Sequence, residues 1–231
     1  MSSGGTGGDL SAADGTGDGA RAVVCDFGGV LTVPLIEAFA AVQARSGASV
    51  EALAGAMSRV TEATGRHPLH DLEKGLVSEA DFLAGLEAEL DGEISLRGFS
   101  EAYFSALHPN KEMMSYMAEL RRRGLRTALL TNNVREWEPR WRAKIPDLDE
   151  VFQIVVDSAF VGMRKPEPEI YELTLDRLGG VAAEDCVFVD DTDVNCDAAR
   201  VLGIRAVHFR ETRQAIGEVE VALGRGLSGA R

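Results

Sequence analysis

Cysteine is scarce in this chain of 231 residues, which contains three: Cys25, Cys186 and Cys196. They are too few and too core-like for a framework of disulfide bonds. Proteins without such a framework usually belong to a reducing compartment. We therefore expect a cytoplasmic location.

Long apolar runs and excess positive charge are also lacking. The sequence has no apolar run of about 18 residues and no basic leader followed by an apolar stretch, so we expect neither a membrane span nor export. Lys and Arg number 24 against 37 Asp and Glu, which gives a formal net charge of −13. Because such a field repels phosphates, it argues against nucleic acid and anionic membranes as partners. The sequence leaves the oligomeric state open.

Residues 1–20 contain almost nothing to bury, being mainly Gly, Ser, Thr, Asp and Ala. Such a composition is typical of disorder. We expect this stretch to form a disordered tail.

A short apolar run ends on a carboxylate near the start of the folded part. Ala22–Cys25 predicts a strand buried on both faces, and Asp26 follows at its carboxyl end. In open α/β sheets this edge binds ligands. Gly28 and Gly29 then allow backbone N–H groups to approach an anion closely. The plain alternative is a glycine-rich turn capped by Asp26.

Three later segments place polar side chains at comparable positions. Thr131 and Asn132 end a second apolar run, and their hydroxyl and amide groups suit phosphate oxygens. Lys165 precedes Pro166, which favours a helix start, although a lone lysine there would usually be solvated. Asp190 and Asp191 end a third apolar run; adjacent acids repel unless a cation or hydrogen-bond donors compensate, and this predicts a Mg²⁺ site.

Strand and helix patterns alternate over most of the chain. Residues 33–107 have helical spacing with no convincing strand, whereas strands are expected at 153–157, 186–191 and 206–209 and helices at 166–178 and around 198–202. The predicted fold class is α/β, a three-layer, doubly wound (Rossmann-like) parallel sheet core, 21–32 and 108–231, with an inserted all-helical cap, 33–107.

The ordered set Asp26, Thr131, Lys165 and Asp190-Asp191 resembles the haloacid dehalogenase-like (HAD) hydrolase superfamily. The resemblance covers about Arg21 to Arg210 and is strongest to the phosphatases related to the N-terminal domain of soluble epoxide hydrolase and to several sugar phosphatases. It implies an Mg²⁺-dependent hydrolase of a small phosphorylated metabolite, with Asp26 as the nucleophile that forms an aspartyl-phosphate.

The resemblance also implies roles for the other residues. Mg²⁺ would be held by Asp26, the backbone carbonyl of Gly28 and Asp191, with Asp190 in support. Thr131 and Lys165 would bind the phosphoryl oxygens, helped by Asn132 and by the backbone amides up to Gly29. The helical cap would close over the site and select the leaving group.

Gly28 departs from the family pattern, because most phosphatases of this superfamily carry an Asp there as general acid and base. Loss of such help typically costs ~10²–10⁴-fold in rate. Three explanations stay open: a leaving group that needs little protonation, such as an anomeric sugar phosphate; a proton from the cap, with His67 or His70 as the source; or a poor catalyst that binds a phosphorylated ligand. Two plain surface histidines are the simpler interpretation of His67 and His70.

Two further hypotheses remain beside the phosphatase. A metal-independent dehalogenase would also lack an Asp at position 28. Without a metal ion, however, the free-energy cost of placing the carboxylates of Asp190 and Asp191 side by side would be unexplained. A non-catalytic phospho-ligand binding protein could use the same fold.

Overall fold

The computed structural model describes residues 20–90, 92, 94–145 and 147–224. The expected tail, 1–20, lies outside the described residues except for Ala20. No helix within the described ranges is long and apolar enough to cross a membrane.

A five-stranded parallel sheet forms the centre, with the strand order β3-β2-β1-β4-β5. The strands are β1 (Ala22–Cys25), β2 (Arg126–Thr131), β3 (Ile154–Asp157), β4 (Cys186–Asp190) and β5 (Arg205–His208). The chain runs from β1 to β2 and β3 on one side and then crosses over to β4 on the other side of β1. The strand order therefore reverses between β1 and β4, and such sheets bind ligands at that position. The predicted doubly wound α/β fold is therefore confirmed.

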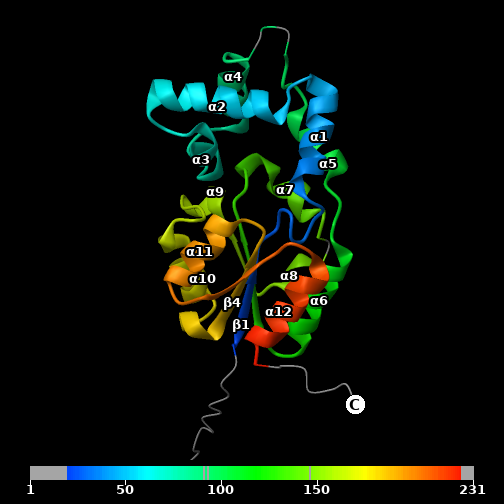
Figure 1. The fold of residues 1–231 in the computed structure, drawn as a ribbon, viewed down its shortest axis with the longest axis vertical. Helices are drawn as coiled ribbons and strands as arrows, with labels where there is room; N and C mark the ends of the chain where they lie inside the picture. Colours follow the sequence, from blue (N-terminus) through cyan, green and yellow to red (C-terminus); the bar gives the residue numbers. More distant parts are fainter. Residues whose placement is uncertain (1–19, 91, 93, 146, 225–231) are drawn as a thin grey trace, which may run out of the picture.

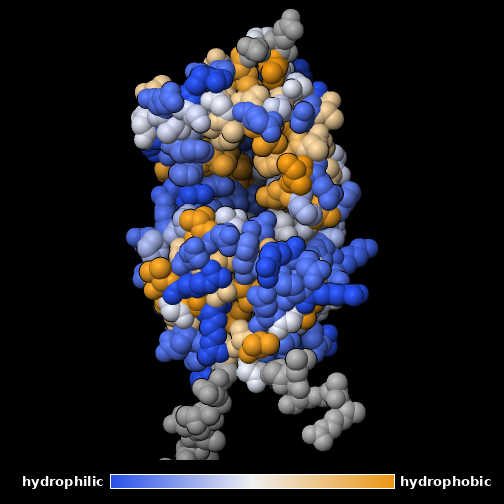
Figure 2. All heavy atoms as spheres, in the orientation of Figure 1, coloured by the Kyte–Doolittle hydropathy of each residue, from blue (hydrophilic) through white to orange (hydrophobic). Residues whose placement is uncertain are grey.

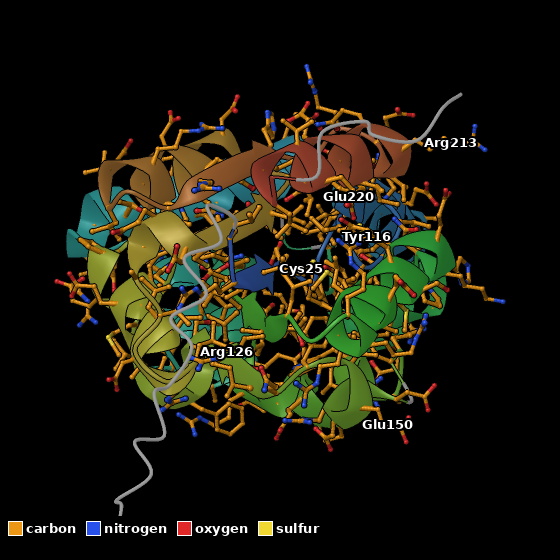
Figure 3. All side chains as sticks on the ribbon, turned by 90° about the horizontal axis from the view of Figure 1, so that it is seen from below. Cys25, Tyr116, Arg126, Glu150, Arg213 and Glu220 are labelled. Carbon is orange, nitrogen blue, oxygen red and sulfur yellow. The ribbon has the colours of Figure 1, made fainter. Side chains whose placement is uncertain are left out.

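The central strand β1 is buried on both faces, as its run of apolar residues predicts. Val23 and Cys25 belong to the hydrophobic cluster on one face of the sheet, and Ala22 and Val24 to the cluster on the other. Figure 3 shows Cys25 near the middle of the molecule. Because side chains along β1 alternate between the two faces, this alternation determines the direction in which the side chain of Asp26 points at the end of the strand.

Helices cover both faces of the sheet. One layer contributes to the cluster around Val23 and contains α6 (Lys111–Arg122), α7 (Glu138–Arg142), α8 (Leu148–Val151) and α12 (Thr212–Ala222). The other contributes to the cluster around Val24 and contains α10 (Pro168–Arg177) and α11 (Asp193–Val201). Short elements complete the core: α9 (Ser158–Val161), η1 (Arg135–Trp137) and η2 (Ala183–Asp185).

Polar contacts also join α6 to α12. Tyr116 donates a hydrogen bond to Glu220 at 2.9 Å, and Arg123 forms an ion pair with the same carboxylate at 2.5 Å. Figure 3 shows Tyr116 and Glu220 on the neighbouring helices. Arg123 lies beside the amino ends of β1 and β2, at the edge of the sheet opposite Asp26, so these contacts tie the helices of the core together.

Five helices lie between β1 and α6: α1 (Leu35–Ser46), α2 (Val50–Thr64), α3 (Pro68–Glu73), α4 (Glu79–Glu87) and α5 (Phe99–Ala106). We call residues 35–106 the helical insert. It stands above the carboxyl ends of the strands (Figure 1). Its two connections to the core run side by side, since Val33 N donates to His108 O at 2.8 Å and Asn110 N donates to Leu31 O at 2.8 Å.

Two helix starts differ from the sequence prediction. The helix expected from Pro166 begins at Pro168, because residues 164–167 form a turn closed by Glu167 N donating to Arg164 O. The helix expected around 198 begins earlier, at Asp193, directly after the acidic pair. At the second start, the backbone N–H of Thr192 donates to Asp190 Oδ1 at the end of β4.

Candidate active site

A cavity of about 580 Å³ lies between the helical insert and the carboxyl ends of the strands. Asp26, Gly28, Thr131, Asn132 and Lys165 line its floor together with Asp191. Figure 2 shows the surface hollowed between the insert and the core, with hydrophobic residues in and beside the hollow. The sequence-predicted strand-end residues therefore meet at one place, while Gly29 and Asp190 lie just outside the lining.

Lys165 joins two carboxylates at this floor. Its Nζ donates to Asp26 Oδ1 and to Asp190 Oδ2, each at 2.6 Å, and its side chain is 2% exposed. Burial alone would lower the pKa of Lys165, but Asp190 and Asp26 outweigh it and raise that pKa. The lysine is thus charged and fixed beside Asp26.

Asp26 and Asp191 carry raised pKa values. Burial is the largest cause for Asp26, and with repulsion from Asp190 and Asp191 it raises the pKa to about 7 against the opposing effect of Lys165. Burial and Asp190 likewise raise the pKa of Asp191. Because one lysine faces three carboxylates, the floor carries excess negative charge.

Oxygen atoms of Asp26, Asp190 and Asp191 all lie within 4.8 Å of one another. This is the hard-oxygen donor chemistry that Mg²⁺ prefers. Asp190 is already held by Asn195 Nδ2 at 3.0 Å and by Thr192 N at 2.9 Å, in addition to Lys165. The donor set therefore fits a divalent cation, with Asp26 and Asp191 as its more accessible members.

The lack of a side chain at Gly29 leaves room for the carboxylate of Asp191 at the floor of the cavity. Its φ is +76°, and a Cβ atom would lie 2.1 Å from Asp191 Oδ2, so a side chain here would collide with that carboxylate. Its N–H donates to Thr32 Oγ1 at 3.0 Å. The substrate-binding amide expected at Gly29 is thus already engaged within the loop.

Gly28 faces an apolar neighbour. A Cβ atom at this position would lie 3.2 Å from both methyl carbons of Leu35, which begins α1. An aspartate at residue 28 would therefore crowd the first residue of the helical insert, whose methyl groups would have to move by a few tenths of an ångström. This contact was not predictable from local sequence patterns, because Leu35 belongs to a different element.

Asn132 contacts the backbone of Lys165 from both sides. Asn132 Oδ1 accepts from Lys165 N at 2.8 Å, and Asn132 Nδ2 donates to Lys165 O at 2.9 Å. Both side-chain atoms of the amide therefore contact the backbone of Lys165, and the phosphate contact expected from Asn132 stays a prediction. Thr131 Oγ1 has only long contacts, to Asn132 O at 3.4 Å and Asn133 Nδ2 at 3.5 Å, which leaves its hydroxyl available to a ligand.

His67 is not among the residues that line the cavity, whereas His70 is. His67 precedes α3 and stacks on His70, with ring centroids 4.4 Å apart. Burial, then Arg164 and His67, lower the pKa of His70, so its ring is neutral near pH 7. Of the two histidines considered from the sequence, His70 is therefore the one whose side chain can meet a ligand in the cavity.

Glu73 and Arg164 are lining residues that sequence reasoning missed. Arg164 Nε contacts Glu73 Oε2 at 2.6 Å, and both side chains are 15% exposed. The pair ties α3 of the insert to the segment that carries Lys165. Lys74 and Glu167 make a second ion pair between the same parts at 2.6 Å. No local motif marks either pair.

The fold and the floor together define an α/β enzyme that carries a carboxylate at the end of its central strand. A model of the haloacid dehalogenase-like hydrolase family matches residues 20–203. The chain belongs to that family, which confirms the predicted hydrolase.

Named relatives support the same assignment. The chain is 33% identical over 129 residues to bifunctional epoxide hydrolase 2 of Rattus norvegicus, covering 54% of this chain and 23% of that protein. It is 33% identical over 138 residues to a phosphoserine phosphatase of Thermus thermophilus, covering 58% of this chain and 54% of that protein. The chain thus spans about a quarter of the first relative and about half of the second.

The solved structures show the fold. A HAD family enzyme of Bacteroides thetaiotaomicron, in complex with magnesium and inorganic phosphate, superposes with a TM-score of 0.62 at 22% identity, covering 82% of this chain and 93% of that chain.

Proposed function

We propose that this protein is a Mg²⁺-dependent phosphomonoesterase in which Asp26 attacks the phosphorus atom. One observation carries the proposal: Asp26 lies 2.6 Å from the buried ammonium of Lys165 and beside a second carboxylate, Asp191. A lysine paired in this way stabilises negative charge on a phosphoryl group. The phosphatase among the relatives and the neighbour that binds magnesium and phosphate agree with it.

Asp26, the Gly28 carbonyl and Asp191 would hold the metal, and Mg²⁺ bound there would supply Lewis-acid stabilisation of the phosphoryl oxygens. Asp190 supports the site by orienting Lys165. The other roles in the reaction belong to side chains of the protein.

The reaction has two steps. An Asp26 oxygen forms a bond to phosphorus while the bond from phosphorus to the leaving oxygen breaks, and Thr131 and Lys165 stabilise the phosphoryl oxygens. The leaving alkoxide takes its proton from water, because residue 28 is glycine and no acidic side chain projects there. Water then attacks phosphorus and loses a proton to the hydroxide that the first step left, while the bond from phosphorus to Asp26 breaks and inorganic phosphate leaves.

Gly28 makes the first step slow for poor leaving groups and the second step slow for every substrate. The missing acid and base help corresponds to ~10²–10⁴-fold in rate. We therefore propose substrates whose leaving group needs little protonation, acting under a cap formed by residues 33–107 that excludes bulk water. His70 replaces His67 as the histidine of that cap nearest the reaction.

Hydrolysis of an aryl phosphate tests the proposal, because its leaving group is good. We expect turnover with Mg²⁺, none with EDTA, and none from Asp26→Asn in either condition. Asp193→Asn is the matched control, since this exposed aspartate lies outside the carboxylate cluster. Halide release from a haloacid without metal would favour the dehalogenase instead. Phosphate binding without turnover would favour a non-catalytic binding protein.

A further inference from the structure

Tyr103 differs from the other two tyrosines of the chain in what its hydroxyl group contacts. Tyr116 donates a hydrogen bond to Glu220 at 2.9 Å, and Tyr171 donates to the backbone carbonyl of Asn195 at 3.0 Å. Tyr103 is 7% exposed, yet its hydroxyl makes no hydrogen bond to any residue that the structure describes. Because buried tyrosine hydroxyls usually find a partner, we looked for one in a bound ligand.

The ring of Tyr103 is held by four other aromatic rings. Their centroids lie 5.0–6.4 Å from its own, and they belong to Phe39, Phe99, Phe104 and Trp137. Three of these rings are in the helical insert and the fourth is in the core, so both parts fix the orientation of Tyr103. Tyr103 lines the cavity, and its oxygen is not one of the fully enclosed polar atoms. The hydroxyl is therefore rigidly placed and open to a ligand.

The charges that act on Tyr103 show which part of the cavity its hydroxyl faces. Burial raises the pKa of Tyr103, and the carboxylates of Asp26, Asp191 and Glu73 raise it further, in that order. Asp26 and Asp191 line the floor of the cavity. The hydroxyl is therefore protonated near pH 7, and Asp26 is the charge that acts on it most strongly.

Other polar side chains of the insert are less suited to donate a hydrogen bond above Asp26. Among the described residues of the insert, those that line the cavity beside Tyr103 are His70, Glu73 and Glu79. Ionised carboxylates accept hydrogen bonds and donate none. Asp26 is not among the described groups that shift the pKa of His70, whereas it is the first of those that act on Tyr103. Tyr103 is thus the donor of the insert that faces Asp26.

In-line displacement puts the leaving oxygen on the side of phosphorus opposite the attacking oxygen of Asp26. That side faces the helical insert, which stands above the carboxyl ends of the strands (Figure 1). We propose that the Tyr103 hydroxyl donates a hydrogen bond to the leaving oxygen and stabilises the negative charge that develops there. This role rests on the proposed function and adds a catalytic residue to it.

Tyr103 keeps its own proton in this role. Because its pKa is raised above the usual value of about 10, its phenolate would be a stronger base than the phenolate that leaves an aryl phosphate. The leaving oxygen therefore still takes its proton from water. The hydrogen bond lowers the barrier of the first step alone, since the leaving group has gone before water attacks phosphorus.

A series of aryl phosphates, from dinitrophenyl phosphate to phenyl phosphate, tests this role. Tyr103→Phe removes the hydroxyl and keeps the packed ring. We expect its kcat/KM with Mg²⁺ to fall by about 10- to 100-fold for phenyl phosphate, the effect of losing a hydrogen bond to a charged oxygen. It should stay unchanged for dinitrophenyl phosphate, whose leaving group needs no such help. An equal loss for both substrates, or no loss for phenyl phosphate, would overturn the inference.

Tyr116→Phe is the matched control, because it removes a hydroxyl that joins α6 to α12 outside the cavity. It should change kcat/KM for neither substrate. Because no described residue accepts a hydrogen bond from the Tyr103 hydroxyl, Tyr103→Phe should unfold at a temperature no lower than wild type. A clear fall in that temperature would show that the hydroxyl holds the fold, and would overturn the inference.

Rapid quenching separates the two steps of the reaction. Phosphorylation of Asp26 by phenyl phosphate should be slower in Tyr103→Phe than in wild type, whereas release of phosphate from Asp26 should be equally fast in both. A slower release would place Tyr103 at the attacking water and would overturn the inference. Absence of Mg²⁺-dependent turnover of dinitrophenyl phosphate by wild-type protein, by contrast, would count against the proposed function.

Discussion

The side-chain amide of Asn132 makes two hydrogen bonds to the backbone of Lys165, to its N–H at 2.8 Å and to its carbonyl at 2.9 Å. Asn132 follows β2 and Lys165 precedes α10, so this contact joins two segments that the sheet alone would not hold in register. The ammonium of Lys165 reaches Asp26 and Asp190 from a backbone that is fixed in this way.

Asn132→Ala should therefore lower kcat without removing any group that touches the phosphate. Displacement of a positioned group by about 1 Å costs ~10²-fold in rate, and we expect a loss of about 10- to 100-fold. Metal affinity, measured by calorimetry with Mg²⁺, should stay unchanged because Asn132 is not among the clustered carboxylates. Unchanged kcat in Asn132→Ala would show that Lys165 is held by other contacts.

The side chain of Leu35 limits the space that is available to an acidic side chain at residue 28. Gly28→Asp alone must move the Leu35 methyl carbons by a few tenths of an ångström from a contact of 3.2 Å, and we expect this crowding to limit the activity of that variant. In the double variant Gly28→Asp, Leu35→Ala the space is free, and kcat for glycerol phosphate should rise by up to about 10²-fold over Leu35→Ala. Additive effects in this double-mutant cycle would mean that Leu35 does not obstruct residue 28.

Asp157 gives a pH-dependent contribution to stability at the neighbour strand of Thr131, with which it is paired in the sheet. It ends β3 and caps α9, accepts a hydrogen bond from Ala159 N at 3.0 Å, and burial raises its pKa from 3.8 to about 6. Because the folded state binds this proton more tightly than the unfolded state, the contribution is fully present below about pH 4 and is lost as the pH rises through about 6.

Asp157→Asn keeps the acceptor for Ala159 and removes the titration. Denaturant unfolding should show it more stable than wild type by about 1–3 kcal/mol at pH 7.5, with the difference shrinking towards pH 4. A difference that does not depend on pH would mean that Asp157 has an ordinary pKa.

The sequence predicted the parts of this protein that depend on local pattern. Three short apolar runs, each followed by a polar group, were sufficient to predict the central strands and the meeting of Asp26, Thr131 and Asp190, because parallel strands end at a common edge. The family resemblance added Lys165, whose position in a loop has no periodic signal.

Contacts between segments far apart in the chain were not predictable in the same way. Leu35 over Gly28, the Glu73–Arg164 ion pair and the choice of His70 over His67 depend on how the helical insert sits on the core. Periodicity places a side chain on a face of its helix but gives no orientation between helices. The substrate cavity lies between these parts, and its apolar character emerged only with the structure.

In the proposed reaction, Asp26 carries the phosphoryl group between the two steps. Because Gly28 provides no base for the second step, transfer of the phosphoryl group from an aryl phosphate to Asp26 should be fast and its release by water should be slow.

Rapid acid quenching of wild-type protein with Mg²⁺ and ³²P-labelled aryl phosphate measures this directly. We expect a burst of phenol close to one equivalent per chain and a hydroxylamine-labile label on the peptide that contains Asp26, absent from Asp26→Asn. Steady turnover without a burst and without label on that peptide would contradict it.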